Sequence, residues 1–132
     1  MTRMGIDLVD VRRIKEKAEK SSNFVPKLLT NAEYEYLLTK PTKTAKGGEI
    51  SPYFQTLAGF FAAKEAFLKA LGIGFSTGLK LKEIQVLHNA NGAPILKVDG
   101  SLKEIVDGLG VKNCSISISH DGDYAIAVVS VE

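Results

Sequence analysis

Two acidic residues, Asp7 and Glu65, occupy positions where a globular protein usually places apolar side chains. Asp7 interrupts the run 4–9, whose alternation predicts a β-strand, and aspartate is poorly suited to the interior of a strand. Glu65 falls in the apolar stripe of a predicted helix, one turn after Phe61 and one turn before Leu68. An ionised carboxylate in such surroundings must find a cation, a metal ion or a proton.

Each carboxylate has a structural interpretation and a chemical one. Glu65 can pair with Lys69, four residues further along the helix, in the order that favours such a pair. Asp7 can accept hydrogen bonds from loop amides at the end of its strand. Alternatively, Asp7 can be a metal ligand, because the bare backbone at Gly5 eases a close approach.

A long helix over residues 51–72 is expected to position Glu65. Ser51 is its predicted N-cap, Pro52 lies in the first turn, and Gly72 closes it as a left-handed residue. Spacings of three and four place the following residues on one face: Phe54, Leu57, Ala58, Phe61, Glu65 and Leu68.

The strand that carries Asp7 leads into a predicted helix that begins after Asp10, its N-cap, and runs to about Ser21. Arg13, Lys17 and Lys20 form a basic stripe on that helix. This stripe is the expected docking surface if the protein docks onto a partner.

Two further helical segments and a loop precede the long helix. Residues 24–29 predict a short helical or irregular segment, and Thr30 with Glu33 forms a capping box for the next helix. That helix should end by residues 40–41, before a proline. Residues 41–50 predict a loop that is either mobile or a ligand-binding flap.

The glycine-rich residues 72–78 suggest a phosphate-binding loop, but they follow a helix instead of preceding one. A connector is therefore the default interpretation of this segment. Lys69 beside it still offers the positive charge that a phosphate needs.

The C-terminal half predicts an antiparallel sheet. Strands are expected at 83–88 and 94–98 around an Asn91-Gly92 turn, and at 115–120 and 124–131 around a second turn. A short helix over 102–109, capped by Ser101, separates the two hairpins. Small side chains on the second hairpin should let the long helix lie close: Ser115, Ser117, Ala125 and Ala127.

The two histidines receive different interpretations. His120 ends its predicted strand at the rim of the sheet, where a histidine is more often a turn hydrogen-bonder than a ligand group. His88 has no supporting context and is expected at the surface.

Composition limits the protein class. The 132 residues, 45% hydrophobic and 24% charged, indicate one ordinary globular domain. The sequence lacks a membrane-length apolar run and a signal peptide, and Cys114 is its single cysteine, so we expect a cytoplasmic protein without membrane contact or disulfides.

Charge is unevenly distributed along the chain. Residues 1–46 carry ten Lys or Arg and six Asp or Glu, a net of +4, whereas residues 47–132 carry seven and nine, a net of −2. The basic N-terminal part favours an acidic partner. Because the sequence shows neither aromatic interleaving nor a nucleic-acid motif, we expect no nucleic-acid binding.

Three segments resemble the signatures of holo-acyl-carrier-protein synthases, the short bacterial type of 4′-phosphopantetheinyl transferase. They are Gly5-Ile6-Asp7 followed by Arg13, residues 61–72, and Ile118-Ser119-His120. The resemblance implies an α+β fold in a single domain over 1–132, with an antiparallel sheet packed against a long central helix. It also implies a homotrimer with active sites at the subunit interfaces.

The resemblance further implies a reaction: Mg²⁺-dependent transfer of 4′-phosphopantetheine from coenzyme A to a serine of apo acyl carrier protein, releasing adenosine 3′,5′-bisphosphate. Asp7 and Glu65 match the metal-binding carboxylates, and two suffice for an ion that keeps waters and binds substrate phosphate. Lys69 joins them as a catalytic group.

The remaining matches concern substrate binding. Lys69, His120, Gly72 and, as a further positive group, Lys64 correspond to coenzyme A contacts, and Arg13 corresponds to an anchor for the acidic carrier protein. The general base stays open between Glu65 and a metal-bound hydroxide. Two alternatives from other classes are a non-catalytic coenzyme A or nucleotide-binding module and a Mg²⁺-dependent phosphohydrolase.

Overall fold

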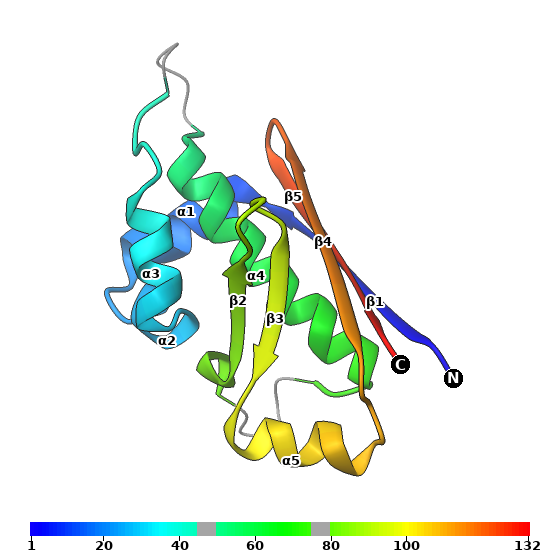
Figure 1. Cartoon of the computed structure of the whole chain (residues 1–132). Helices are drawn as coiled ribbons and strands as arrows, with labels where there is room; N and C mark the ends of the chain where they lie inside the picture. The colour runs from blue at the N-terminus through cyan, green and yellow to red at the C-terminus, as the bar shows by residue number, and fades with distance from the viewer. Residues whose placement is uncertain (45–49, 75–79) are drawn as a thin grey trace.

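Helix α4 (Pro52–Leu71) runs through the middle of the molecule, and the other elements pack around it (Figure 1). The predicted caps are confirmed: the Ser51 side chain accepts a hydrogen bond from the Phe54 N–H, and Gly72 has φ 74°. Most of the helix is buried, not just one stripe. Its buried residues are Leu57, Ala58, Gly59, Phe60, Ala62, Ala63, Lys64, Ala66, Phe67, Leu68, Ala70 and Leu71.

The computed structural model describes residues 1–44, 50–74 and 80–132. Residues 45–49 of the predicted 41–50 loop and residues 75–78 of the 72–78 segment therefore lie outside the described residues. The described elements, apart from α4, are β1 (Arg3–Asp10), α1 (Val11–Lys20), α2 (Phe24–Leu28), α3 (Asn31–Leu38), η2 (Leu81–Glu83), β2 (Ile84–His88), β3 (Pro94–Val98), α5 (Gly100–Gly108), β4 (Cys114–Asp121) and β5 (Tyr124–Val131).

An antiparallel sheet in the order β1-β5-β4 covers one side of α4. Its register places Asp7 of β1 opposite Ala127 of β5, which in turn lies opposite Ile118 of β4. β5 turns its buried face toward the core through Ala125, Ala127, Val129 and Val131. The predicted α+β architecture is thus confirmed.

The serines of β4 do not serve the role that the sequence suggested. Ser115 and Ser117 are exposed, whereas Ile116 and Ile118 pack against the core. The side chains of the strand alternate as predicted, but the isoleucines and not the serines face α4, because burying the isoleucines removes more apolar surface from water. Close packing there depends on Gly59, where an added Cβ would lie 3.2 Å from Ile118 Cγ2.

Gly5 brings β1 into backbone contact with α4. A Cβ at this position would lie 1.9 Å from the carbonyl oxygen of Ala66 and 2.6 Å from the amide nitrogen of Ala70. No side chain fits in that space, so glycine is required by a close approach and not by an unusual turn. The contact fixes the strand of Asp7 over the C-terminal half of α4.

The remaining elements flank α4 away from this contact. α1, α2 and α3 lie together on one side, and the hairpin β2-β3 crosses the helix (Figure 1). The capping box of Thr30 and Glu33 is confirmed. The start of α5 differs from the prediction: Asp99 occupies the N-cap position, while Ser101 binds the Glu83 carboxylate through its amide and hydroxyl.

Membrane-spanning helices are absent from the part of the chain that the structure describes.

Candidate active site

Asp7, Lys69 and Glu65 converge where β1 crosses the C-terminal half of α4. Lys69 Nζ donates to Asp7 Oδ1 over 3.0 Å and to the carbonyl oxygen of Ile6 over 3.1 Å. The structural alternative, in which Lys69 pairs with Glu65, is therefore not the arrangement that the structure adopts for Lys69. Its ammonium reaches across to the strand, where Asp7 has a side chain that is only 13% exposed.

Glu65 lies close enough to Asp7 for the two charges to repel each other. Burial raises the pKa of Glu65 above its ordinary value, and the neighbouring Asp7 raises that pKa further, while Lys69 and Lys17 oppose the shift. Two like charges held together in partly buried surroundings favour a cation between them. The two acidic side chains thus share one electrostatic site, although they are 58 positions apart in the sequence.

One oxygen of this site lacks a partner. Among the described residues, Asp7 Oδ2 is the buried side-chain atom that makes no hydrogen bond. Groups of three or more His, Cys, Asp or Glu with metal-binding geometry are also absent from the described ranges. An orphaned carboxylate oxygen beside a second carboxylate fits Mg²⁺, which takes few protein ligands and completes its coordination with water and phosphate oxygens.

A hollow of about 150 Å³ opens beside Asp7. Asp10, Arg13, Lys17 and Phe61 contribute to its wall. Lys17 Nζ lies 5.4 Å from the centre of the Phe61 ring, so α1 brings a positive charge toward the face of α4 that carries Glu65. The hollow therefore combines acidic groups with two cations from α1.

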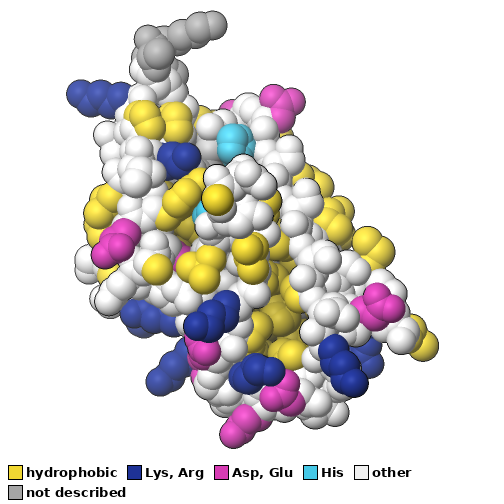
Figure 2. Space-filling view, in the orientation of Figure 1, with side chains coloured by type: hydrophobic (Ala, Val, Ile, Leu, Met, Phe, Trp, Pro, Cys, Tyr) yellow, Lys and Arg dark blue, Asp and Glu magenta, His cyan; other side chains and the backbone are white. Residues whose placement is uncertain are grey.

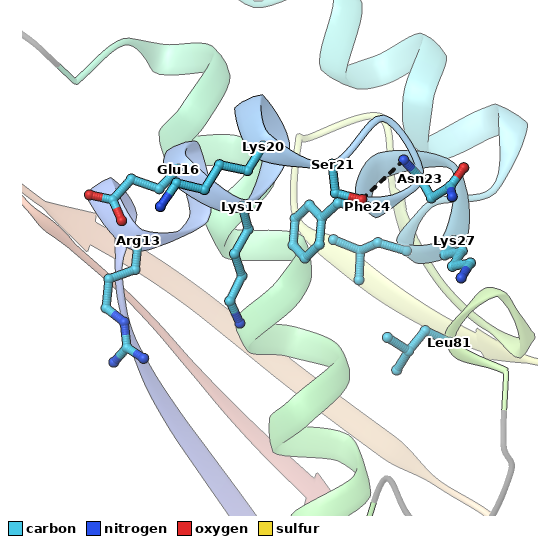
Figure 3. A pocket seen from close by; sticks show the side chains of 10 residues that line it. Arg13, Glu16, Lys17, Lys20, Ser21, Asn23, Phe24, Lys27 and Leu81 are labelled. Carbon is cyan, nitrogen blue, oxygen red and sulfur yellow. Dashed lines mark hydrogen bonds between the residues drawn. The ribbon is translucent and has the colours of Figure 1, made fainter.

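A larger groove of about 600 Å³ adjoins this hollow and shares Arg13 and Lys17 with it. Figure 3 shows both side chains extending from α1 in the same direction, with Phe24 beside Lys17. Lys20 and Lys27 add positive charge, and the apolar lining comes from Phe24, Leu28 and Leu81. The groove is suited to an acidic partner that also inserts an apolar side chain.

Lys64 does not contribute to this surface, and its predicted contact with coenzyme A is wrong. The side chain is fully buried, and its ammonium donates to Glu33 Oε1 over 2.7 Å and to the carbonyl oxygens of Leu28 and Leu81. Burial lowers the pKa of Lys64, and the Glu33 carboxylate opposes that shift. An ammonium has three donors, so none remains for a phosphate.

His120 is exposed at the end of β4 and lies apart from Asp7. It lines a different cavity, of about 170 Å³, beside Gln55 and Gly59 in the N-terminal half of α4. The rise of 1.5 Å per residue separates that half from Lys69 by more than two turns. His120 and Asp7 thus line different cavities of the single chain.

His88 lines the same cavity as His120 and is half-buried, so it is less exposed than the sequence suggested. Its ring stacks on Tyr36 with centroids 3.9 Å apart and meets the Phe60 ring edge-on at 6.2 Å. Burial, together with Lys40, lowers the pKa of His88. No pattern in the sequence around His88 predicts that its ring stacks on Tyr36 of α3.

Gly72 lies one turn beyond Lys69 at the open end of α4. Its N–H is used within the helix cap, where it bonds to the Lys69 carbonyl oxygen over 3.1 Å, and an added Cβ would meet no atom of the described residues within 4 Å. The described residues therefore leave the surface beside Gly72 uncovered. Its predicted contact with coenzyme A stays a prediction.

Comparison with known proteins decides the family of the chain. Residues 3–129 match the profile of the 4′-phosphopantetheinyl transferase superfamily. The chain belongs to this superfamily. It is accordingly a transferase, and the fold and family predicted from the sequence are both confirmed.

Individual relatives agree with the assignment to this superfamily. The chain is 39% identical over 124 residues to the holo-acyl-carrier-protein synthase of a Thermoanaerobacter species, covering 94% of this chain and 82% of the relative. It is 38% identical to the Clostridium kluyveri enzyme of the same name, covering 98% and 88%.

Solved structures of the superfamily share the fold. The Helicobacter pylori holo-acyl-carrier-protein synthase in complex with coenzyme A superposes with a TM-score of 0.80 at 31% identity, covering 98% of this chain and 99% of that one. A synthase–coenzyme A complex from Chronobacterium ammoniagenes gives 0.84 at 25% identity, covering 100% and 97%.

Proposed function

We propose that this chain is a holo-acyl-carrier-protein synthase. In this proposal it transfers the 4′-phosphopantetheine arm of coenzyme A to a serine of apo acyl carrier protein in a Mg²⁺-dependent reaction, and residues 1–132 form one transferase domain. The observation that supports the proposal most is that Asp7 of β1 and Glu65 of α4 lie close together, and that Asp7 Oδ2 is buried without a hydrogen-bond partner among the described residues. The superfamily match and relatives of that name support it.

The residues of the site suit this reaction. The serine oxygen bonds to the phosphorus that carries pantetheine, the bond from that phosphorus to the bridging oxygen breaks, and adenosine 3′,5′-bisphosphate leaves with the electron pair. Asp7 and Glu65 would hold Mg²⁺, which supplies charge neutralisation for the diphosphate. Lys69 stands beside Asp7 with a half-exposed ammonium, so it is placed to bind a phosphate oxygen.

The serine proton must pass to a base. Glu65 is the candidate on this chain, because burial and Asp7 raise the pKa of its carboxyl and so make the carboxylate a stronger base. The alternative base is a hydroxide that would be bound to the metal. Glu65 and this hydroxide therefore both remain candidate bases.

Apo acyl carrier protein is the proposed partner of the groove on α1 and α2, which we call the basic groove. Arg13 would anchor an acidic surface of the carrier there. Because Arg13 and Lys17 line both the basic groove and the hollow at Asp7, a partner seated in the groove lies next to the carboxylates. Opposite charges would mainly raise the rate of encounter.

A homotrimer with shared active sites is part of the proposal. Met4, Ile6 and Leu8 leave 68%, 55% and 63% of their surface exposed on the outer face of β1. Hydrophobic side chains also appear along the outer side of the three-stranded sheet in Figure 2. Apolar exposure of this kind indicates an interface between proteins. In this assembly a neighbouring copy would contribute residues to the substrate site beside Asp7 and Glu65. A cytoplasmic location stays a prediction.

One assay tests the proposed reaction against its alternatives. The protein is incubated with coenzyme A, Mg²⁺ and apo carrier protein, and the carrier is weighed by mass spectrometry. We expect a mass gain of one phosphopantetheine arm that EDTA abolishes. Coenzyme A binding without a mass gain would indicate a binding module, and coenzyme A hydrolysis without a carrier adduct would indicate a phosphohydrolase.

A further inference from the structure

A fully buried ion pair lies directly beneath the basic groove. Lys64 of α4 and Glu33 of α3 have 0% exposed side chains, and Lys64 Nζ lies 2.7 Å from Glu33 Oε1. Removing two charges from water is costly, so a buried pair is not by itself evidence of stabilisation. The significance of this pair lies in the segments that it holds in place.

Every polar atom of this pair is used, and all of its bonds except the cap bond from Thr30 join two different elements. Glu33 Oε1 also accepts from the Thr30 N–H over 2.8 Å, and Glu33 Oε2 accepts from the Val86 N–H over 2.8 Å. The pair thereby ties α3 to α4 and to β2. A satisfied polar network of this kind permits one arrangement of the backbone around it.

Two bonds of the Lys64 ammonium end on the walls of the basic groove. Its acceptors include the carbonyl oxygens of Leu28 in α2 and Leu81 in η2. Both residues line the groove, and Figure 3 shows Leu81 facing it across from α1. The next residue of α4 is Glu65, so one backbone segment carries both the support of the groove and a carboxylate of the site.

We propose that Lys64 is a positioning residue for carrier-protein recognition, which fixes the spacing of the two apolar groove walls through the carbonyl oxygens of Leu28 and Leu81. The inference rests on the proposed function, because it assigns the groove to the carrier protein. In the proposed function coenzyme A binds at Asp7, Glu65 and Lys69, and none of these three residues lines the basic groove. Loss of Lys64 should therefore weaken the use of the carrier more than the use of coenzyme A.

The experiment compares Lys64→Met with the double variant Glu33→Gln/Lys64→Met. Methionine has a similar length without donors, and the double variant also removes the carboxylate charge left unpaired. Measured are the melting temperature, KM for apo carrier protein and KM for coenzyme A. Lys103→Met, in an exposed pair with Asp107 on α5, is the matched control.

In Lys64→Met we expect a lower melting temperature and a KM for carrier protein that rises on the order of tenfold, with KM for coenzyme A within about twofold of wild type. In the double variant the melting temperature recovers only in part, because the unpaired charge is gone but a glutamine at position 33 can accept from only one of the Thr30 and Val86 N–H groups. The carrier KM stays high, because the carbonyl oxygens of Leu28 and Leu81 still lack their donor. The control keeps wild-type values.

A carrier KM that recovers together with the melting temperature would overturn the proposal and leave Lys64 a structural residue only. So would an equal rise in both KM values. If Lys64→Met does not fold, the double variant alone decides. If neither folds, Glu33→Asp, which keeps both charges but shortens the acid, must raise the carrier KM. Absence of transfer by the wild-type protein would instead refute the proposed function.

Discussion

Lys69 donates a hydrogen bond to Asp7 across 3.0 Å, although the two residues lie 62 positions apart in the chain. Because Lys69 follows Glu65 by one turn of α4, this bond aligns the strand carboxylate with the helix carboxylate. It uses Asp7 Oδ1 and leaves Oδ2 buried without a partner among the described residues. The geometry of the site thus depends on the contact between β1 and α4.

That contact should not tolerate a side chain at Gly5. Alanine there would press its Cβ against the backbone of Ala66 and Ala70, which cannot move away without displacing α4. We expect Gly5→Ala to lower the free energy of unfolding by about 3 kcal/mol, the upper end for overpacking, and to abolish transfer. Denaturant unfolding and the transfer assay measure the two effects.

Gly108→Ala is the matched control for this substitution. Gly108 ends α5, and an added Cβ there meets nothing within 4 Å. Its stability should remain within about 0.5 kcal/mol of wild type, as for exposed substitutions. Similar stability of the two variants would contradict the close contact between strand and helix.

Stability should depend on pH through Glu65. Its pKa in the folded protein is raised above 4.5, so the folded state binds this proton more tightly than the unfolded state does. Wild type therefore loses stability as pH rises from 4.5 through the folded pKa. Glu65→Gln lacks this loss. In metal-free buffer, the variant should gain stability relative to wild type as pH rises through this window.

The measurement is urea unfolding of wild type and Glu65→Gln at several pH values between 4 and 8, with EDTA present. A stability difference between the two proteins that stays constant across this range would contradict the conclusion that burial and Asp7 raise the pKa of Glu65. Addition of Mg²⁺ at the upper end should stabilise wild type and not the variant.

Much of this site follows from local sequence rules. Asp7 breaks an apolar alternation, and Glu65 breaks a helical stripe, so both stand out without any structure. The caps at Ser51 and Gly72 fixed the ends of α4 equally well. Such features depend on residues within a few positions, which is why patterns of spacing predict them.

Contacts between distant segments were not predictable in the same way. Lys64 reads like a surface cation beside Glu65, and its burial follows only from the meeting of α2, α3 and η2 above it. Nor does any spacing tell whether Lys69 turns toward Glu65 or toward Asp7. Tertiary packing decides both cases, because the partners come from other parts of the chain.

Arg13→Ala should weaken carrier-protein docking in a salt-dependent manner. Removing its charge lowers the attraction between the basic groove and an acidic carrier, and salt screens that attraction over about 10 Å at 0.1 M. We expect KM for carrier protein to rise by roughly three- to tenfold at low salt and less at high salt. KM for coenzyme A should not change.

Arg12→Ala is the control on the same helix, because the Arg12 guanidinium pairs with Asp10 and Asp123. Its carrier KM should change much less. Equal effects of the two substitutions, or an Arg13→Ala effect that is the same at all salt concentrations, would contradict docking through the basic groove.

The proposed trimer should dissociate when its apolar face becomes charged. Ile6 is 55% exposed on the outer face of β1, so Ile6→Lys leaves the core of the subunit intact. Sedimentation should change from trimer to monomer, with loss of transfer. Leu38→Lys, at an exposed apolar residue of α3, should stay trimeric. A wild-type protein that sediments as a monomer would contradict the proposed assembly.

Asp7 and Glu65 are proposed to hold one metal ion together, and a double-mutant cycle tests this directly. The Mg²⁺-dependent rate of carrier modification is measured for wild type, Asp7→Asn, Glu65→Gln and the variant with both changes. If the two residues share one ion, each single change lowers the rate by on the order of 100-fold or more, and the double change lowers it no further. Near-normal turnover in either single variant, or losses that multiply in the double variant, would contradict the shared site.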